Sequence, residues 1–116
     1  MSMEQRNKRP FAVTIRFSVN PSDQEELMEM VTMMLMEIGP FLASQQGFLE
    51  FRCHRSVDGG SVLNHLLWES REDHDRCMAS PEMEAAGDAL MEWVESGRAT
   101  LSSEEWELFS TIRKPE

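Results

Sequence analysis

The chain has 116 residues, 21 of them acidic and 11 basic, and its formal net charge at neutral pH is −10. This length indicates one domain, residues 10–113, behind a loose polar arm over residues 1–9, and it is enough for one core and one pocket. The negative charge repels phosphate backbones and anionic lipid surfaces, which argues against nucleic acid or a membrane as partner. No apolar run approaches the roughly 18 residues of a membrane span, and the N-terminus lacks the apolar core of a signal peptide. We therefore expect a cytoplasmic protein.

The first predicted element is a strand, "FAVTIRFSV", because its odd positions from Phe11 to Val19 are apolar and its even positions are mostly polar. A helix is expected next, over "NPSDQEELMEMVTMMLMEIGPFLASQQ", with Ser22 as its cap and Glu25 completing a capping box. Gly39-Pro40 is expected to kink or interrupt this helix. Its apolar stripe consists of Leu27, Val31, Met34, Leu35, Ile38 and Leu42.

Two further strands, "GFLEFRCHRS" and "SVLNHLLWES", are joined through "VDGG", which is a strong hairpin signal. Such a turn pairs odd positions of the first strand with even positions of the second. The face predicted to lie under the helices carries Leu49, Phe51, Cys53, Val62, Asn64, Leu66 and Trp68. The opposite face carries Glu50, Arg52, His54, Leu63, His65, Leu67 and Glu69.

A second helical region follows, with Ser70 capping "REDHDRCMA" and Ser80-Pro81 restarting a helix that stops at Gly97. The last strand is expected in "EEWELFSTIR", with Trp106, Leu108 and Ile112 turned toward the core and Phe109 turned outward.

The order strand, helix, strand, strand, helix, strand predicts an α+β, ferredoxin-like βαββαβ fold, a four-stranded antiparallel sheet with helices on one face. The other sheet face mixes Leu63, Leu67 and Phe109 with Arg16, Arg52, His54 and His65. This face is too apolar for free surface and too charged for a core, so we expect a homodimer packed sheet to sheet. A monomer with a patchy surface is the alternative.

Asn64 and Trp68 stand four residues apart in one strand and are expected to share its helix-covered face. A buried amide and a buried indole N–H each need a hydrogen-bond partner. A wet or ligand-filled pocket lined by Phe17, Phe51, Leu66 and Trp106 would supply partners. A filled core, with the amide satisfied by backbone, is the other interpretation.

The stretch from Gly47 to Ala86 resembles the signature region of the antibiotic biosynthesis monooxygenase (ABM) domain family. The shared marks are a Gly-Phe entering the strand, an acidic-glycine hairpin, then "N-x-x-x-W-E-S" and a Ser-Pro-Glu restart. The flanking elements match in order from Phe11 to Arg113. The family has the ferredoxin-like fold and typically forms dimeric α/β barrels.

Some members that this chain resembles are cofactor-independent oxygenases of anthrones or quinols, which use the substrate anion to reduce O₂. The resemblance implies no cofactor, a small aromatic substrate, and a catalytic pair at Asn64 and Trp68. Those oxygenases have a tyrosine six residues after the tryptophan, where this chain has His74. Histidine at that position is either a base or a solvated helix residue. A relay through tyrosine is excluded, because the chain contains none.

Other functions are weaker. The alternative from a different class is a non-catalytic ligand-binding or stress-response module with the same cavity. The haem-degrading branch needs a helical tryptophan followed by an axial histidine, where this chain has Cys77 and Gly87. No metal site is expected, because His54, His65 and His74 do not share one element at ligand spacing. Cys53 and Cys77 are expected to be reduced thiols.

Overall fold

The computed structural model describes residues 9–116, so the predicted arm lies outside the described residues apart from Arg9. Its elements are, in chain order, β1 (Phe11–Val19), the 3-10 helix η1 (Pro21–Asp23), α2 (Gln24–Ala43), β2 (Phe48–Arg55), β3 (Ser61–Trp68), α3 (Arg71–Met78), α4 (Pro81–Glu95) and β4 (Ala99–Glu107). The predicted βαββαβ order is confirmed.

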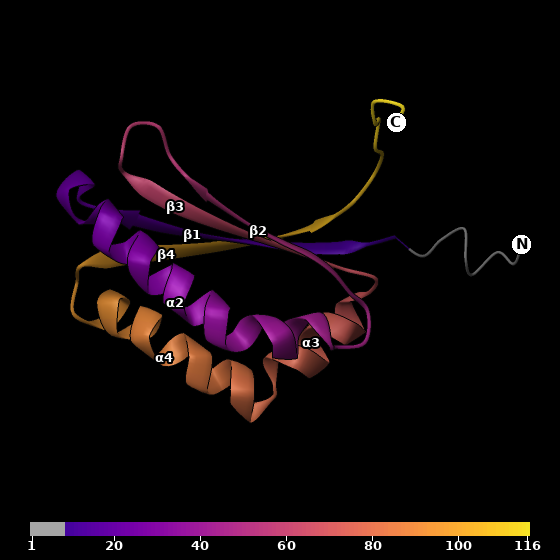
Figure 1. Ribbon diagram of the computed structural model, residues 1–116, viewed down its shortest axis with the longest axis horizontal. Coiled ribbons are helices and arrows are strands. Elements are labelled where there is room, and N and C mark those ends of the chain that lie inside the picture. Colours follow the sequence, from indigo (N-terminus) through magenta and orange to yellow (C-terminus); the bar gives the residue numbers. More distant parts are fainter. Residues whose placement is uncertain (1–8) are drawn as a thin grey trace, which may run out of the picture.

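The four strands form one sheet in the order β2-β3-β1-β4, and every neighbouring pair is antiparallel. The three α-helices cover one face of this sheet, and the other face is left open (Figure 1). This is the ferredoxin-like arrangement that the sequence predicts. None of the helices in residues 9–116 is long and apolar enough to cross a bilayer.

The core lies between the sheet and the helices. The stripe predicted for α2 is confirmed: Leu27, Val31, Ile38 and Leu42 are buried, and the other two members pack against them. One buried polar residue of α2, Gln24, donates hydrogen bonds to the carbonyl oxygens of Ser56 and Ser61, at 3.2 and 3.1 Å. These bonds fasten the start of the helix to the β2–β3 hairpin.

The helices differ from expectation at two places, the start of α2 and Gly39-Pro40. Asn20, rather than Ser22, caps the first turn, because the chain enters α2 through the 3-10 helix and the Asn20 side chain accepts from the Ser22 N–H. The expected interruption at Gly39-Pro40 is wrong, since α2 continues through Pro40 to Ala43. The caps predicted at Ser70 and Ser80 are confirmed. Gly97 ends α4 with φ +82°, as expected.

The hairpin faces are as predicted except at the start of β2. Phe51 lies opposite Leu66 and Cys53 lies opposite Asn64 in the ladder. A register shift lies between Phe48 and Glu50. As a result Phe48, rather than Leu49, lies opposite Trp68, and Leu49 is 45% exposed. The prediction for Leu49 assumed unbroken alternation, and a β-bulge breaks it.

The last strand begins earlier than expected, and its side chains lie on the opposite faces of the sheet from those predicted. β4 starts at Ala99, and its register sets Phe11 opposite Glu107 and Ala12 opposite Trp106. Trp106 therefore lies on the open face, with its Nε1–H donating to Thr14 Oγ1 at 2.9 Å. The prediction that Trp106 faces the core is wrong. Leu108 and Ile112, expected beside it, follow the end of the strand and are exposed.

Candidate active site

The inner face of β3 carries the residues on which the candidate site depends. Burial alternates strictly along this strand, with Val62, Asn64, Leu66 and Trp68 buried and the residues between them partly exposed. Asn64 is 4% exposed and Trp68 is fully buried. Both side chains lie under the helices, as the period of two predicts.

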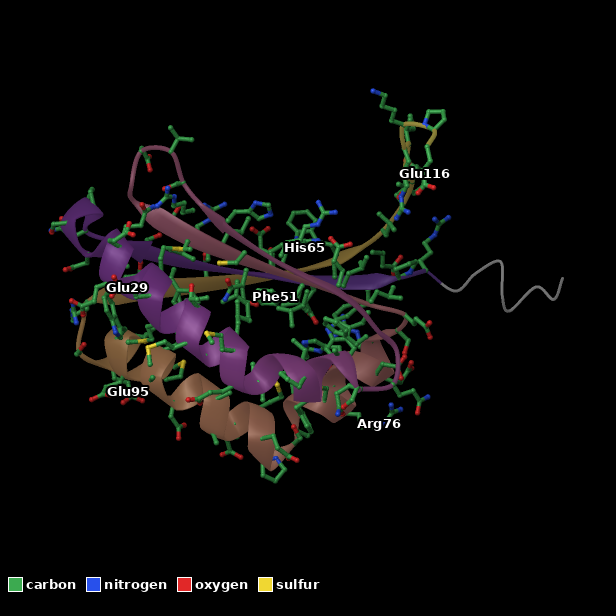
Figure 2. All side chains as sticks on the ribbon, viewed as in Figure 1. Glu29, Phe51, His65, Arg76, Glu95 and Glu116 are labelled. Atoms are coloured by element: carbon green, nitrogen blue, oxygen red, sulfur yellow. The ribbon has the colours of Figure 1, made fainter. Side chains whose placement is uncertain are left out.

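A cavity of about 200 Å³ lies between this face and the helices. Figure 2 shows Phe51, one of its lining residues, in the layer between the sheet and α2. Sixteen residues line it: Ile15, Phe17, Met34, Leu35, Ile38, Leu42, Phe51, Asn64, Leu66, Met78, Met83, Ala86, Gly87, Leu90, Met91 and Leu101. Asn64 has the one polar side chain in this set, so the cavity offers a ligand apolar surface and a single amide.

The amide oxygen of Asn64 is buried and has no hydrogen-bond partner. Its cross-strand neighbours on the same face are Ile15 and Cys53. Burial raises the pKa of the Cys53 thiol, so that side chain stays neutral and offers only a weak donor. A buried acceptor without a donor costs about 1–3 kcal/mol. In a cavity it is available to a ligand that donates a hydrogen bond.

Trp68 lies two residues further along β3 than Leu66, beside the cavity rather than in its wall. Its indole stacks edge-on against Phe48 at a centroid distance of 5.4 Å and against His74 at 5.9 Å. The indole N–H is buried and also has no hydrogen-bond partner. Leu42 and Leu66 both pack around Trp68 and line the cavity, so they form the partition between the two.

The imidazole of His74 projects from α3 onto the aromatic cluster at the end of β3. It lies 5.3 Å from the Phe11 ring as well as against Trp68, and its Nδ1 is 2.9 Å from Asp75 Oδ1. The interpretation of His74 as a solvated helix residue is therefore wrong, because its ring is packed between two aromatic side chains. It does not line the cavity.

Three of the four residues expected to line the pocket do so, namely Phe17, Phe51 and Leu66. The fourth, Trp106, is 49% exposed on the opposite side of the sheet. Its apolar character suggested a core position, but the register of β4 decides its side.

The stripe predicted for α2 supplies Met34, Leu35, Ile38 and Leu42 to the cavity wall, whereas the contribution of α3 and α4 was not predicted. Met78, Met83 and Met91 line the cavity together with Met34, and in Figure 2 several sulfur atoms lie between α2 and α4. Gly87 also lines the cavity, although the sequence marks it only as a glycine where the haem-degrading branch has its axial histidine. The spacing of Gly87 and Met91, one helical turn apart, was the available signal.

Within residues 9–116, no three His, Cys, Asp or Glu side chains converge in a way that could hold a metal ion. His54 and His65 belong to the open face, and Figure 2 shows His65 on the side of the sheet away from the helices. Burial lowers the pKa of His65, and the nearby Arg52 and His54 lower it further. His65 Nδ1 is buried without a hydrogen-bond partner, so the open face also carries a buried polar atom whose hydrogen bond is not satisfied.

Comparison with protein families supports the resemblance seen in the sequence. The model of the family described as "Antibiotic biosynthesis monooxygenase" matches residues 10–89. The matched range includes the strand with Asn64 and Trp68, and His74 after it. No curated protein sequence matches the chain significantly.

Solved structures with the same fold span nearly the whole chain. SnoaB from Streptomyces nogalater, a cofactor-independent oxygenase, is 19% identical with a TM-score of 0.66, over 91% of this chain and 99% of that one. Rv0793 from Mycobacterium tuberculosis is 21% identical with a TM-score of 0.68, over 90% and 99%. A dimeric ferredoxin-like protein from an uncultured marine organism is 14% identical with a TM-score of 0.73, over 90% and 100%. Identities this low establish the fold alone.

Proposed function

Because the chain belongs to the antibiotic biosynthesis monooxygenase family, we propose that it oxidises a small aromatic phenol, anthrone or quinol with O₂ and without a cofactor. The observation that carries this proposal is the unpartnered Asn64 oxygen in an otherwise apolar cavity. The similarity of the fold to SnoaB, a cofactor-independent oxygenase, adds support.

The cavity suits a flat aromatic molecule with one hydroxyl group. Apolar walls stabilise the rings by removing them from water, and Asn64 Oδ1 would accept the hydrogen bond of the hydroxyl. The volume of about 200 Å³ is below the roughly 300 Å³ at which ligand pockets usually begin. Methionine side chains adapt readily, so those in the wall would let the cavity expand around two or three fused rings.

In the proposed reaction the substrate itself supplies the electrons. Loss of a proton gives an electron-rich anion, which passes one electron to O₂ to give superoxide and a substrate radical. The two radicals combine in a carbon–oxygen bond, and the resulting peroxide loses water to leave a carbonyl group. One oxygen atom thus enters the product and the other leaves as water.

Asn64 and Trp68 would act at the two ends of a substrate lying along β3. Four residues of strand separate their Cα atoms by about 13 Å, with Leu66 between them. Asn64 would orient and polarise the substrate oxygen, and the Trp68 indole N–H would donate to the oxyanion or the peroxide. Met78 borders both the cavity and the Trp68 cluster. Displacement of Met78 together with the partition of Leu42 and Leu66 would join the cavity to the indole N–H.

His74 would accept the proton. Asp75 engages its Nδ1 at 2.9 Å and so orients the ring, which leaves Nε2 to exchange a proton. The ring lies against Trp68, so proton transfer also requires the cavity to extend past the partition.

A non-catalytic ligand-binding module is the second candidate. The placement of Trp68 and His74 outside the cavity wall favours it, because a binding protein needs only the Asn64 end of the site.

Oxygen uptake by metal-free, flavin-free protein separates the two candidates. Wild type, Asn64→Ala, Trp68→Phe and His74→Gln would be supplied with anthrones, naphthoquinols and catechols. We expect uptake above the spontaneous rate, and a loss of about 100-fold in each variant, the typical effect of removing one group that stabilises a transition state. Cys53→Ala is the control, since Cys53 neighbours Asn64 but does not line the cavity. No uptake by folded wild type would leave the binding module.

We also propose that the molecule is a homodimer joined through the open face, the sheet surface formed by Ala12, Thr14, Arg16, Glu50, Arg52, His54, Leu63, His65, Leu67, Glu104 and Trp106. The exposed indole of Trp106 and the partnerless buried His65 nitrogen support this proposal. One solved structure with this fold is described as dimeric.

A further inference from the structure

We infer that the ligand enters between α4 and β4, through an opening formed by Gly87, Met91 and Leu101, and that this opening selects uncharged aromatic molecules over carboxylated ones. This inference rests on the proposed function only in using the same cavity. It names the class of ligand that the cavity admits.

The cavity reaches solvent at this opening. Met91 is 43% exposed and Leu101 is 40% exposed, yet both line the cavity. Met91 belongs to α4 and Leu101 to β4, so the opening lies where the last helix crosses the last strand. Phe17, the cross-strand partner of Leu101 on β1, and Leu66 on β3 are buried, so the exposure of the sheet residues in the wall rises toward β4.

Gly87 has no structural reason to be glycine. It lies in the middle of α4, where glycine costs about 1 kcal/mol relative to alanine, and its φ is not in the left-handed region. A Cβ built on it would meet nothing within 4 Å. Gly87 lines the cavity one helical turn before Met91, so the absence of a side chain at this position keeps the opening wider.

The charged residues next to the opening along α4 are acidic, because Asp88 directly follows Gly87 and Glu92 directly follows Met91. Every charged residue of α4 is a carboxylate: Glu82, Glu84, Asp88, Glu92 and Glu95. Inside the cavity a ligand meets no cation, and the unpartnered group of Asn64 is an acceptor. A carboxylate would be repelled at the opening and left without a counter-charge inside.

Direct binding tests this inference without requiring turnover. Calorimetric titrations at pH 7 would compare 2-naphthol, which is uncharged, with 2-naphthoate, which has the same rings and a carboxylate. We expect 2-naphthol to bind at least ten-fold more tightly. Asp88→Lys, beside Gly87, should lower the ratio of the 2-naphthol affinity to the 2-naphthoate affinity about three-fold. Added salt should lower the same ratio, because it screens the repulsion of the carboxylate. Equal binding of the two probes would overturn the charge selection.

Variants of Gly87 test the opening. Gly87→Leu should weaken 2-naphthol binding at least ten-fold, whereas Gly87→Ala should raise the melting temperature and still weaken binding. Gly39→Ala is the matched control, because Gly39 is a helical glycine with open space around it that does not line the cavity. Unchanged 2-naphthol binding in folded Gly87→Leu, or in Gly87→Ala if the leucine variant does not fold, would refute the opening. Binding without oxygen uptake would instead refute the proposed reaction alone.

Discussion

Gly47 is a single residue that fixes how α3 meets the sheet. Its φ is +79°, its carbonyl accepts from the Glu69 N–H at 2.7 Å, and a Cβ built on it would collide with the Asp73 carboxylate. Asp73 is itself buried and hydrogen-bonded to the Ser70 hydroxyl at 2.9 Å. The glycine of the Gly-Phe pair that enters β2 is therefore required because a larger residue would collide with Asp73.

We expect Gly47→Ala to lower the free energy of unfolding by about 2–4 kcal/mol, through backbone strain and displacement of a buried carboxylate. Gly97→Ala is the matched control, since Gly97 has nearly the same φ but nothing within 4 Å of its Cβ. It should cost only about 1 kcal/mol, the strain alone. Urea denaturation of both variants measures the difference, and equal costs would exclude a role for Asp73.

The candidate site was also predictable residue by residue, but only in part. Alternation along β3 placed Asn64 and Trp68 on the buried face. It did not reveal that one lines a cavity and the other lies behind Leu66. Which buried group touches empty space depends on side chains of α2 and α4, and their positions are set by packing.

Between elements, Gln24 is the buried polar link from α2 to the β2–β3 hairpin, beside the exposed ion pair of Glu25 with Arg55. Replacing it with leucine should remove two hydrogen bonds and leave the carbonyls of Ser56 and Ser61 less well satisfied. The expected loss in the free energy of unfolding is about 1–3 kcal/mol. Denaturant titration measures it, with Gln45→Leu as control, because the Gln45 side-chain amide donates to Phe41 and Ser44 at its own helix end rather than to the hairpin. A loss no larger than that of the control would mean that the hairpin docks by apolar contact.

β4 shows where element prediction from pattern fails. Its observed sequence, "ATLSSEEWE", is largely polar and exposed, whereas the apolar alternation lies after it. The strand forms because the turn at Gly97 returns the chain alongside β1, and nine pairs with β1 then hold it. Tertiary pairing overrides a weak local preference here, and it also turns Trp106 to the open face.

At the scale of the whole molecule, the open face determines whether copies associate. Leu67→Arg should convert the proposed dimer to a monomer. The new arginine of each copy would be buried in the interface close to the arginine of the other copy, and the two like charges would repel each other. Light scattering after size exclusion measures the mass, and circular dichroism checks the fold. Val57→Arg, in the exposed hairpin loop, should leave the mass unchanged. A wild-type monomer at high salt, where repulsion between chains of charge −10 is screened, would contradict the dimer.

The sequence by itself determined the element order, the apolar stripe of α2, the caps at Ser70 and Ser80, and the side of β3 that is buried. These features depend on residue spacing and on short-range hydrogen bonds, which are local properties of the chain. The tertiary structure alone decided the side of Trp106, the bulge at Leu49, the packing of His74 and the cavity with its opening at Gly87. Each of these depends on the register between strands or on volume left between helices and sheet, and both are set by contacts between residues far apart in the chain.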